Sequence, residues 1–229
     1  MAGSSLCLLA VRKDRGAAAF NLFGAARHVA DACFLSTRSS CRTRVFPSHA
    51  PDGSPNLCPR IAEQVAERIA RLPRSDELIA YALSVLGSPR HRRAQQVALG
   101  LDYAHLPWPR DASHFERAVS VGMRFVHALE QERPCPEPLL QQAADLAPHE
   151  PLTTLRYDAA ARAAQVAGKV VLAGIEPAWW HAQVGHHGLV ASLLSRGAAG
   201  TSVSQLVDVV ARAACWVRAE QAADALLID

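Results

Sequence analysis

The chain has 229 residues, of which 50% are hydrophobic and 6% aromatic, and it carries a formal net charge of +3 at pH 7. Residues 1–46 hold seven basic and two acidic side chains, a net charge of +5, so residues 47–229, with 17 basic and 19 acidic side chains, sum to −2. This length excludes two large domains. The charge balance of residues 47–229 excludes a general electrostatic attraction of polyanions to that part of the chain.

Residues 1–46 are rich in arginine and serine and poor in acids, which is the composition of an organellar transit peptide. We therefore predict that residues 1–46 are a mitochondrial transit peptide or a flexible basic arm. The apolar stretch 6–11 precedes the positive charges and is too short for a secretory signal. Residues 47–58 have the proline content of a linker, and residues 59–229 are predicted to form the folded domain.

Proline, glycine and serine then divide the chain into segments with helical periodicity. In the first segment, Ile61, Val65, Ile69 and Leu72 recur at steps of four, four and three residues. Predicted helices further along the chain begin at capping residues, such as Asp111, and the last one begins with a capping box of Ser202 and Gln205. The predicted helices cover residues 59–72, 75–87, 89–105, 111–132, 139–147, 153–173, 177–195 and 202–227.

The apolar residues are mostly alanine, which has the highest helix propensity, and short connections favour antiparallel neighbours. The expected fold is therefore all-α: about eight helices in antiparallel hairpins, as an irregular helical bundle or a short solenoid. The last three predicted helices start at residues 153, 177 and 202, at nearly equal intervals. With Leu193-Leu194 and Gln205-Leu206-Val207, this region resembles the α-helical hairpin repeats of organellar proteins, including the octotricopeptide-type RNA-binding families. The resemblance implies stacked helical hairpins over residues 153–227 and transfers no residue-level RNA code.

The sequence contains no recognisable pattern for catalysis or for a cofactor. His181, His186 and His187 diverge around a helix and do not form a metal site. The three cysteines beyond residue 46 and the glycine-containing loops lack nucleophile and phosphate-binding signatures. We expect no enzyme activity, cofactor or metal, and we interpret the uncharged run 177–195 as a buried helix and not as a membrane span.

Four consecutive residues, Arg90, His91, Arg92 and Arg93, occupy the first turn of the predicted helix 89–105. The helix dipole disfavours a cation there by about 0.3–1 kcal/mol, so an acidic protein surface or RNA phosphate would offset the cost. The alternative is that solvent and salt screen it. Trp108, between two prolines, and the pair Trp179 and Trp180 are candidate contacts with a partner, although the pair would equally fill a helical core.

Taken together, these features predict a non-catalytic accessory subunit of a large mitochondrial assembly, in the matrix or on the matrix side of the inner membrane. The mitochondrial ribosome is the first choice, with protein subunits as partners and a few arginine contacts to rRNA. A supernumerary subunit of a respiratory-chain complex or of ATP synthase is an alternative, favoured by the net −2 of residues 47–229. A free-standing organellar RNA-binding helical-repeat protein and an enzyme with an unrecognised helical site are the other classes.

Overall fold

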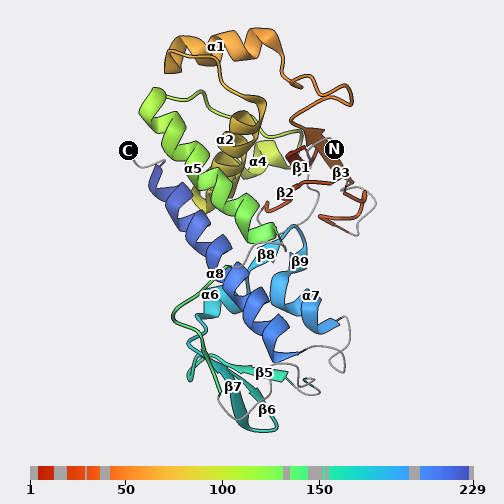
Figure 1. The fold of residues 1–229 in the computed structure, drawn as a ribbon, viewed down its shortest axis with the longest axis vertical. Helices are drawn as coiled ribbons and strands as arrows, with labels where there is room; N and C mark the ends of the chain where they lie inside the picture. The colour runs from red at the N-terminus through yellow and green to blue at the C-terminus, as the bar shows by residue number, and fades with distance from the viewer. Residues whose placement is uncertain are drawn as a thin grey trace. The chain divides into compact units, whose positions relative to one another are not determined.

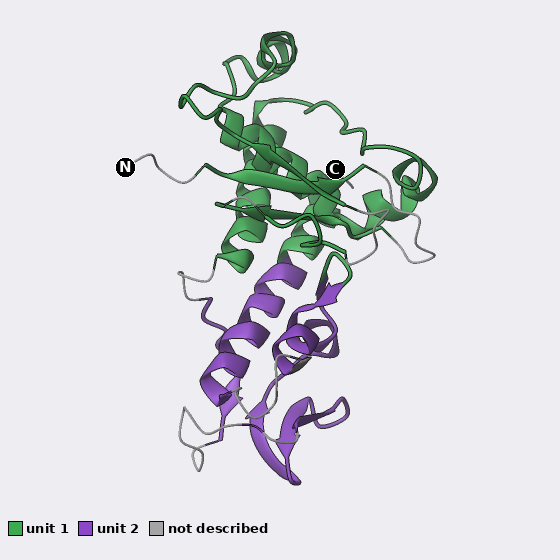
Figure 2. Cartoon of the chain, turned by 90° about the vertical axis from the view of Figure 1, so that its right-hand side faces the viewer, with its two compact units in different colours: residues 1–130, 184–186, 219–229 green, residues 131–183, 187–218 purple. Residues whose placement is uncertain are grey.

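The computed structural model describes residues 5–12, 20–28, 30–36, 42–130, 135–143, 152, 155–195 and 202–226. These residues form helices and three antiparallel sheets, so the all-α prediction is wrong. The chain divides into two compact units (Figure 2). Unit 1 contains Met1–Glu130, Val184–His186 and Ala219–Asp229, and unit 2 contains Gln131–Gln183 and His187–Arg218.

The sheet of unit 1 is built from the segment that was predicted to be a flexible basic arm. β1 (Cys7–Val11) lies between β2 (Phe23–Ala26) and β3 (Thr43–Pro47), and both pairings are antiparallel. Leu9 and Phe23 are fully buried. The short apolar run that is unsuitable as a secretory signal is therefore a central strand with both faces covered, as such runs often are.

The helices of unit 1 pack around two long members, α2 (Ser75–Gly87) and α5 (Ala112–Leu129). Gly122 of α5 lies so close to α2 that an added Cβ would be 1.8 Å from the carbonyl oxygen of Ala80. The predicted helix 89–105 is instead two short helices, α3 (Pro89–Ala94) and α4 (Gln96–Leu99), and α1 is Pro59–Ile69. The predicted N-cap of α5 is confirmed, because Asp111 accepts a hydrogen bond of 2.7 Å from the backbone N–H of His114.

Unit 2 contains a four-stranded sheet where the sequence predicted helices. Its order is β4 (Gln141–Gln142), β7 (Lys169–Ala173), β6 (Ala163–Val166) and β5 (Leu155–Asp158), with every pair antiparallel. Strands β5, β6 and β7 are labelled in Figure 1. The predicted helix 153–173 is therefore wrong. Left-handed backbone at Arg162, Ala167 and Gly168 turns the chain into two consecutive hairpins, and an α-helix cannot contain such residues.

The predicted helix 177–195 is also interrupted. It contains α6 (Pro177–Trp180), the two short paired strands β8 (Gln183–Val184) and β9 (His187–Gly188), and α7 (Leu189–Ser195). The last helix, α8 (Val203–Leu226), agrees with its prediction, and its capping box is present: the Ser202 N–H donates to Gln205 Oε1 at 2.9 Å, and the Gln205 N–H donates to Ser202 Oγ at 3.3 Å.

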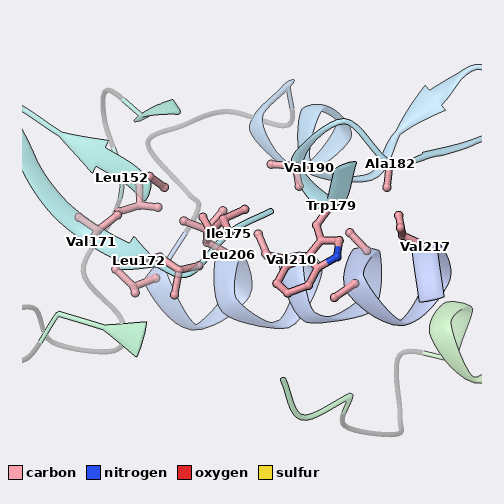
Figure 3. Packing of buried hydrophobic residues seen from close by; sticks show 14 residues of the cluster. Leu152, Val171, Leu172, Ile175, Trp179, Ala182, Val190, Leu206, Val210 and Val217 are labelled. Atoms are coloured by element: carbon pink, nitrogen blue, oxygen red, sulfur yellow. The ribbon is translucent and has the colours of Figure 1, made fainter. Parts of the chain in front are cut away.

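The core of unit 2 joins the sheet to α6 and to the N-terminal part of α8. Leu172 and Ile175 from the sheet region meet Leu206 and Val210 of α8, with Trp179 beside them (Figure 3). This core fixes one face of the sheet and leaves the opposite face of the hairpins uncovered by it. In the described segments, no helix has both the length and the apolar character needed to cross a membrane.

Candidate functional site

In the basic turn, residues 90–93, some side chains are buried and others are exposed to solvent. Arg92 is 8% exposed, and its guanidinium donates to the carbonyl oxygens of Leu86 and Gly87 at 2.8 and 2.9 Å and to Glu220 at 2.8 Å. It also lies 5.2 Å from the ring centre of Phe23. Arg92 is therefore a packing and pairing residue of unit 1.

The electrostatic cost of a basic first turn is offset inside the same unit. The Asp224 carboxylate accepts a hydrogen bond of 2.9 Å from the backbone N–H of Arg90 and another from the Ser88 hydroxyl, which places a negative charge at the start of α3. Burial, followed by the Arg92 charge, lowers the pKa of His91, which favours the neutral form of its imidazole. Arg90 and Arg93 remain exposed and available to an outside anion.

The three tryptophans singled out from the sequence lie in different surroundings. Trp108 is 43% exposed, with the Arg68 guanidinium 6.0 Å from its ring centre. Trp179 is 5% exposed and belongs to the core of unit 2, and Trp180 stacks on Tyr157 with ring centres 4.7 Å apart. The structure therefore places the pair in the packing of unit 2, and a direct contact of any of the three with a partner stays a prediction.

A mixed basic and aromatic surface, which the sequence interpretation missed, lies on the edge strand β3 of unit 1. Arg44 and Phe46 are two residues apart on this strand and both are exposed. The ring of Phe46 packs edge-on against Tyr103, with centres 5.8 Å apart. The alternation of Thr43, Arg44, Val45 and Phe46 was the available signal, since a period of two indicates a half-buried strand.

A second missed surface lies on the side of the unit 2 sheet that faces away from the core. Cross-strand register places Arg156 of β5 opposite Gln165 of β6, and Gln165 opposite Val170 of β7. We call these three residues the hairpin face. The neighbouring row, Tyr157, Ala164 and Leu172, packs in the core. The β6–β7 register shifts between Ala164 and Gln165, which interrupts the alternation along β7, so Val170 is exposed although Leu172, two residues further on, is buried.

In unit 1, the basic turn and β3 offer positive charge and apolar contact, and in unit 2 the hairpin face offers hydrogen-bond donors and apolar contact. Phosphate oxygens and base edges are contacted by groups of these two kinds. Arg90, Arg93 and Arg44 can each hold a phosphate oxygen, and the amide of Gln165 can donate and accept at once. Within the described residues, no group of three or more His, Cys, Asp or Glu side chains is arranged to hold a metal ion.

Comparison with known proteins gives the family. The family model of the Type ISP C-terminal specificity domain matches residues 1–212. Because this match covers most of the chain, the protein belongs to that family. Among curated proteins, no match was found.

Three solved structures share the fold at low sequence identity. The DrdV–DNA complex has a TM-score of 0.67 and 17% identity, over 96% of this chain and 24% of that one. A nuclease-deletion mutant of the Type ISP restriction-modification enzyme LlaGI, in complex with a DNA substrate mimic, has a TM-score of 0.64 and 11% identity, over 95% and 21%. The ATP-dependent Type ISP restriction-modification enzyme LlaBIII bound to DNA has a TM-score of 0.66 and 9% identity, over 96% and 16%. The chain spans less than a quarter of the length of each.

The family match overturns several predictions made from the sequence. The resemblance to organellar helical-hairpin repeats is wrong, and so are the mitochondrial location and the roles in a ribosome, a respiratory complex, ATP synthase or organellar RNA binding. The predicted partners, which were protein subunits of a mitochondrial assembly and rRNA, are wrong for the same reason. The physical reason is that an arginine-rich, acid-poor composition occurs both in transit peptides and in strands with exposed basic residues. Here residues 1–46 form β1, β2 and most of β3.

Proposed function

We propose that this chain binds duplex DNA and supplies sequence specificity to a Type ISP restriction-modification enzyme. The observation that carries the proposal is the match of the specificity-domain family model to residues 1–212. The three similar structures, each of a protein in complex with DNA, support it through the shared fold. We assign no catalytic step to this chain, and propose that cleavage and modification belong to other parts of the enzyme.

The distribution of charge supports this role. Specific DNA binding needs a few well-placed cations for the phosphates and a separate set of side chains for the base edges. Exposed arginines on α3 and β3 of unit 1 provide the first kind of group, and the hairpin face of unit 2 provides the second. The net charge of −2 on residues 47–229 is therefore compatible with DNA binding, although from composition alone this charge argued against binding to a polyanion.

The test is a selection of bound sequences from a randomised library of 20-base-pair duplex DNA, using the full 229-residue chain. We expect repeated rounds at physiological salt to enrich one short motif. A parallel selection from duplex RNA should enrich none, because the major groove of an RNA helix is too deep and narrow for side chains to read. If the DNA recovered after the same rounds shows no enriched motif compared with the starting library, the proposed function is overturned.

The exposed arginines of α3 give a prediction for binding affinity. Arg90→Ala with Arg93→Ala should weaken binding to every DNA sequence by a similar factor. The slope of log K against log salt concentration should fall by about 1.8, because each phosphate contact contributes about 0.9. Fluorescence anisotropy of a labelled duplex at several salt concentrations measures this slope.

The matched control is the charge-retaining pair Arg90→Lys and Arg93→Lys, which should preserve the slope. Thermal unfolding should be nearly unchanged in both double variants, since neither side chain is buried. An alanine double variant with an unchanged salt slope would show that the basic turn does not contact phosphate.

A further inference from the structure

The hairpin face is presented on a strand ribbon whose other side is fixed by the core. Tyr157 donates a hydrogen bond of 2.9 Å to the carbonyl oxygen of Ile175 and stacks on Trp180, which orients β5. Its neighbour Arg156 must therefore point to the opposite side, because successive side chains on a strand alternate. Arg156 is exposed, and Val170, at the other end of the same row, is 42% exposed.

Arg156 differs from the other arginines that the structure describes in unit 2. Arg162 pairs with Glu176 at 2.9 Å, Arg212 with Asp208 at 2.7 Å, and Arg218 with Glu137 at 2.6 Å. The exposed guanidinium of Arg156 has no hydrogen bond or ion pair within the described segments. The nearest acid along its own strand, Asp158, accepts hydrogen bonds of 3.0 Å from the N–H groups of Ala160 and Ala161 in the adjoining turn. The five donors of Arg156 are thus free for an external acceptor.

The side-chain amide of Gln165, directly opposite Arg156, likewise has no hydrogen bond inside the described part of the chain. This half-buried amide can present one acceptor and two donors in a fixed plane. Directly opposed residues of an antiparallel pair have Cβ atoms about 5 Å apart. Their side chains can therefore reach neighbouring base pairs, which are stacked about 3.4 Å apart along one strand.

The turns on either side of the hairpin face are small enough to enter a groove. The β5–β6 turn contains three consecutive alanines, at residues 159–161. The β6–β7 turn is formed by Ala167 and Gly168 with φ values of 48° and 78°, as in a two-residue hairpin, and nothing lies within 4 Å of where a Gly168 Cβ would be. The major groove of B-DNA admits a β-ribbon of this kind, whereas the minor groove is about half as wide.

We propose that the β5–β6 hairpin enters the major groove and that Arg156 reads a guanine while Gln165 reads the adenine of a neighbouring base pair. The guanidinium would donate to guanine O6 and N7, and the amide would pair with adenine N6 and N7, the arrangements that the two side chains form best. Val170, at the end of the row, offers apolar contact to a thymine methyl group. This inference rests on the proposed function and adds the residues and bases through which specificity is exerted.

The experiment compares motifs selected from the randomised 20-base-pair duplex library by the wild-type chain and by Arg156→Ala and Gln165→Ala variants. Arg156→Ala should lose the preference for one guanine, and Gln165→Ala the preference for an adjacent adenine, each by about 5- to 150-fold at that position. The rest of the motif should persist in both variants. Lys169→Ala, at the neighbouring turn, is the matched control and should weaken all sequences without changing the motif.

A base analogue tests the contact itself. Replacing the assigned guanine by 7-deazaguanine removes the N7 acceptor, which should weaken binding of the wild-type chain and leave Arg156→Ala unaffected. Arg156→Lys should lose most of the discrimination, because lysine keeps the charge and lacks the two-donor fork.

The outcomes separate this inference from the proposed function. If the wild-type chain selects a motif and the Arg156 and Gln165 variants select the same one, base readout lies elsewhere and the proposed function stands. The same conclusion follows if 7-deazaguanine weakens both the wild-type chain and Arg156→Ala equally. If the wild-type chain selects no motif, the proposed function itself fails.

Discussion

Arg92→Ala is expected to destabilise unit 1 by about 3–5 kcal/mol, the usual cost of removing one partner from a buried charge pair. The change removes the donors to the Leu86 and Gly87 carbonyl oxygens and to Glu220, and it leaves space beside Phe23. Those carbonyls lie in the last turn of α2, where a cation is favourable. Urea unfolding followed by hydrogen exchange of peptides covering residues 75–87 measures the loss.

The adjacent Arg93→Ala is the matched control, because it removes the same side chain from an exposed position of the same helix. Its unfolding free energy should change by no more than about 0.5 kcal/mol. Arg92→Lys should fall between the two, since an ammonium group cannot satisfy the planar arrangement of two carbonyls and a carboxylate. A stable Arg92→Ala protein with lost DNA binding would show instead that Arg92 contacts the partner, as the sequence alone suggested.

Gly122→Ala is expected to destabilise unit 1 by about 3 kcal/mol or more, the upper range for overpacking in a tight core. In an exposed helix this substitution stabilises by about 1 kcal/mol, so the sign itself is informative. Here the new Cβ would lie 1.8 Å from the Ala80 carbonyl oxygen and 2.8 Å from its Cα, and backbone atoms of a packed helix cannot move aside cheaply. Hydrogen exchange of peptides from α2 and α5 should accelerate together.

Gly24→Ala provides a second buried glycine for comparison. Its added Cβ would meet side-chain carbons of Leu35, Val184 and Leu129 at 3.5–3.8 Å, which are ordinary contact distances. The unfolding free energy of this variant should stay within about 0.5 kcal/mol of the wild-type value. Equal effects at the two positions would contradict the close approach of α2 and α5.

Helices with strong local signals were predictable from the sequence. The starts of α1 at Pro59 and of α5 after Asp111 follow from proline and cap preferences, and the Ser202–Gln205 capping box marks α8. Each of these signals lies within a few residues and does not depend on the rest of the fold.

The strands were missed because alanine-rich composition was taken as a helix signal. In residues 155–173, alternation along β5 and the Ala167-Gly168 turn indicate hairpins, and cross-strand pairing overrides the helix propensity of Ala163 and Ala164. Residues 1–46 were misread for a related reason. Their positive charge was interpreted as a transit peptide, but the alternation of side chains along β3 was a strand signal. This alternation places Arg44 and Phe46 on one side of the strand.

The candidate site could be predicted only in part. The basic turn was noticed because it breaks the helix-dipole rule, but the sequence could not show that Asp224 and Glu220, more than 120 residues away, offset the cost. Arg156 and Gln165 were beyond reach, because their importance depends on strand register and on the pairing of the other arginines. Distant pairings of this kind leave no local pattern.

Sequence-selective binding of DNA by this chain is measured by one ratio of dissociation constants. The ratio compares a scrambled duplex of equal length and composition with the selected duplex, both measured at 150 mM salt with the full chain. We predict a ratio of at least about 10³, the lower range for specific DNA-binding proteins. A ratio close to one would contradict sequence-selective binding, because binding would then depend on phosphate charge alone.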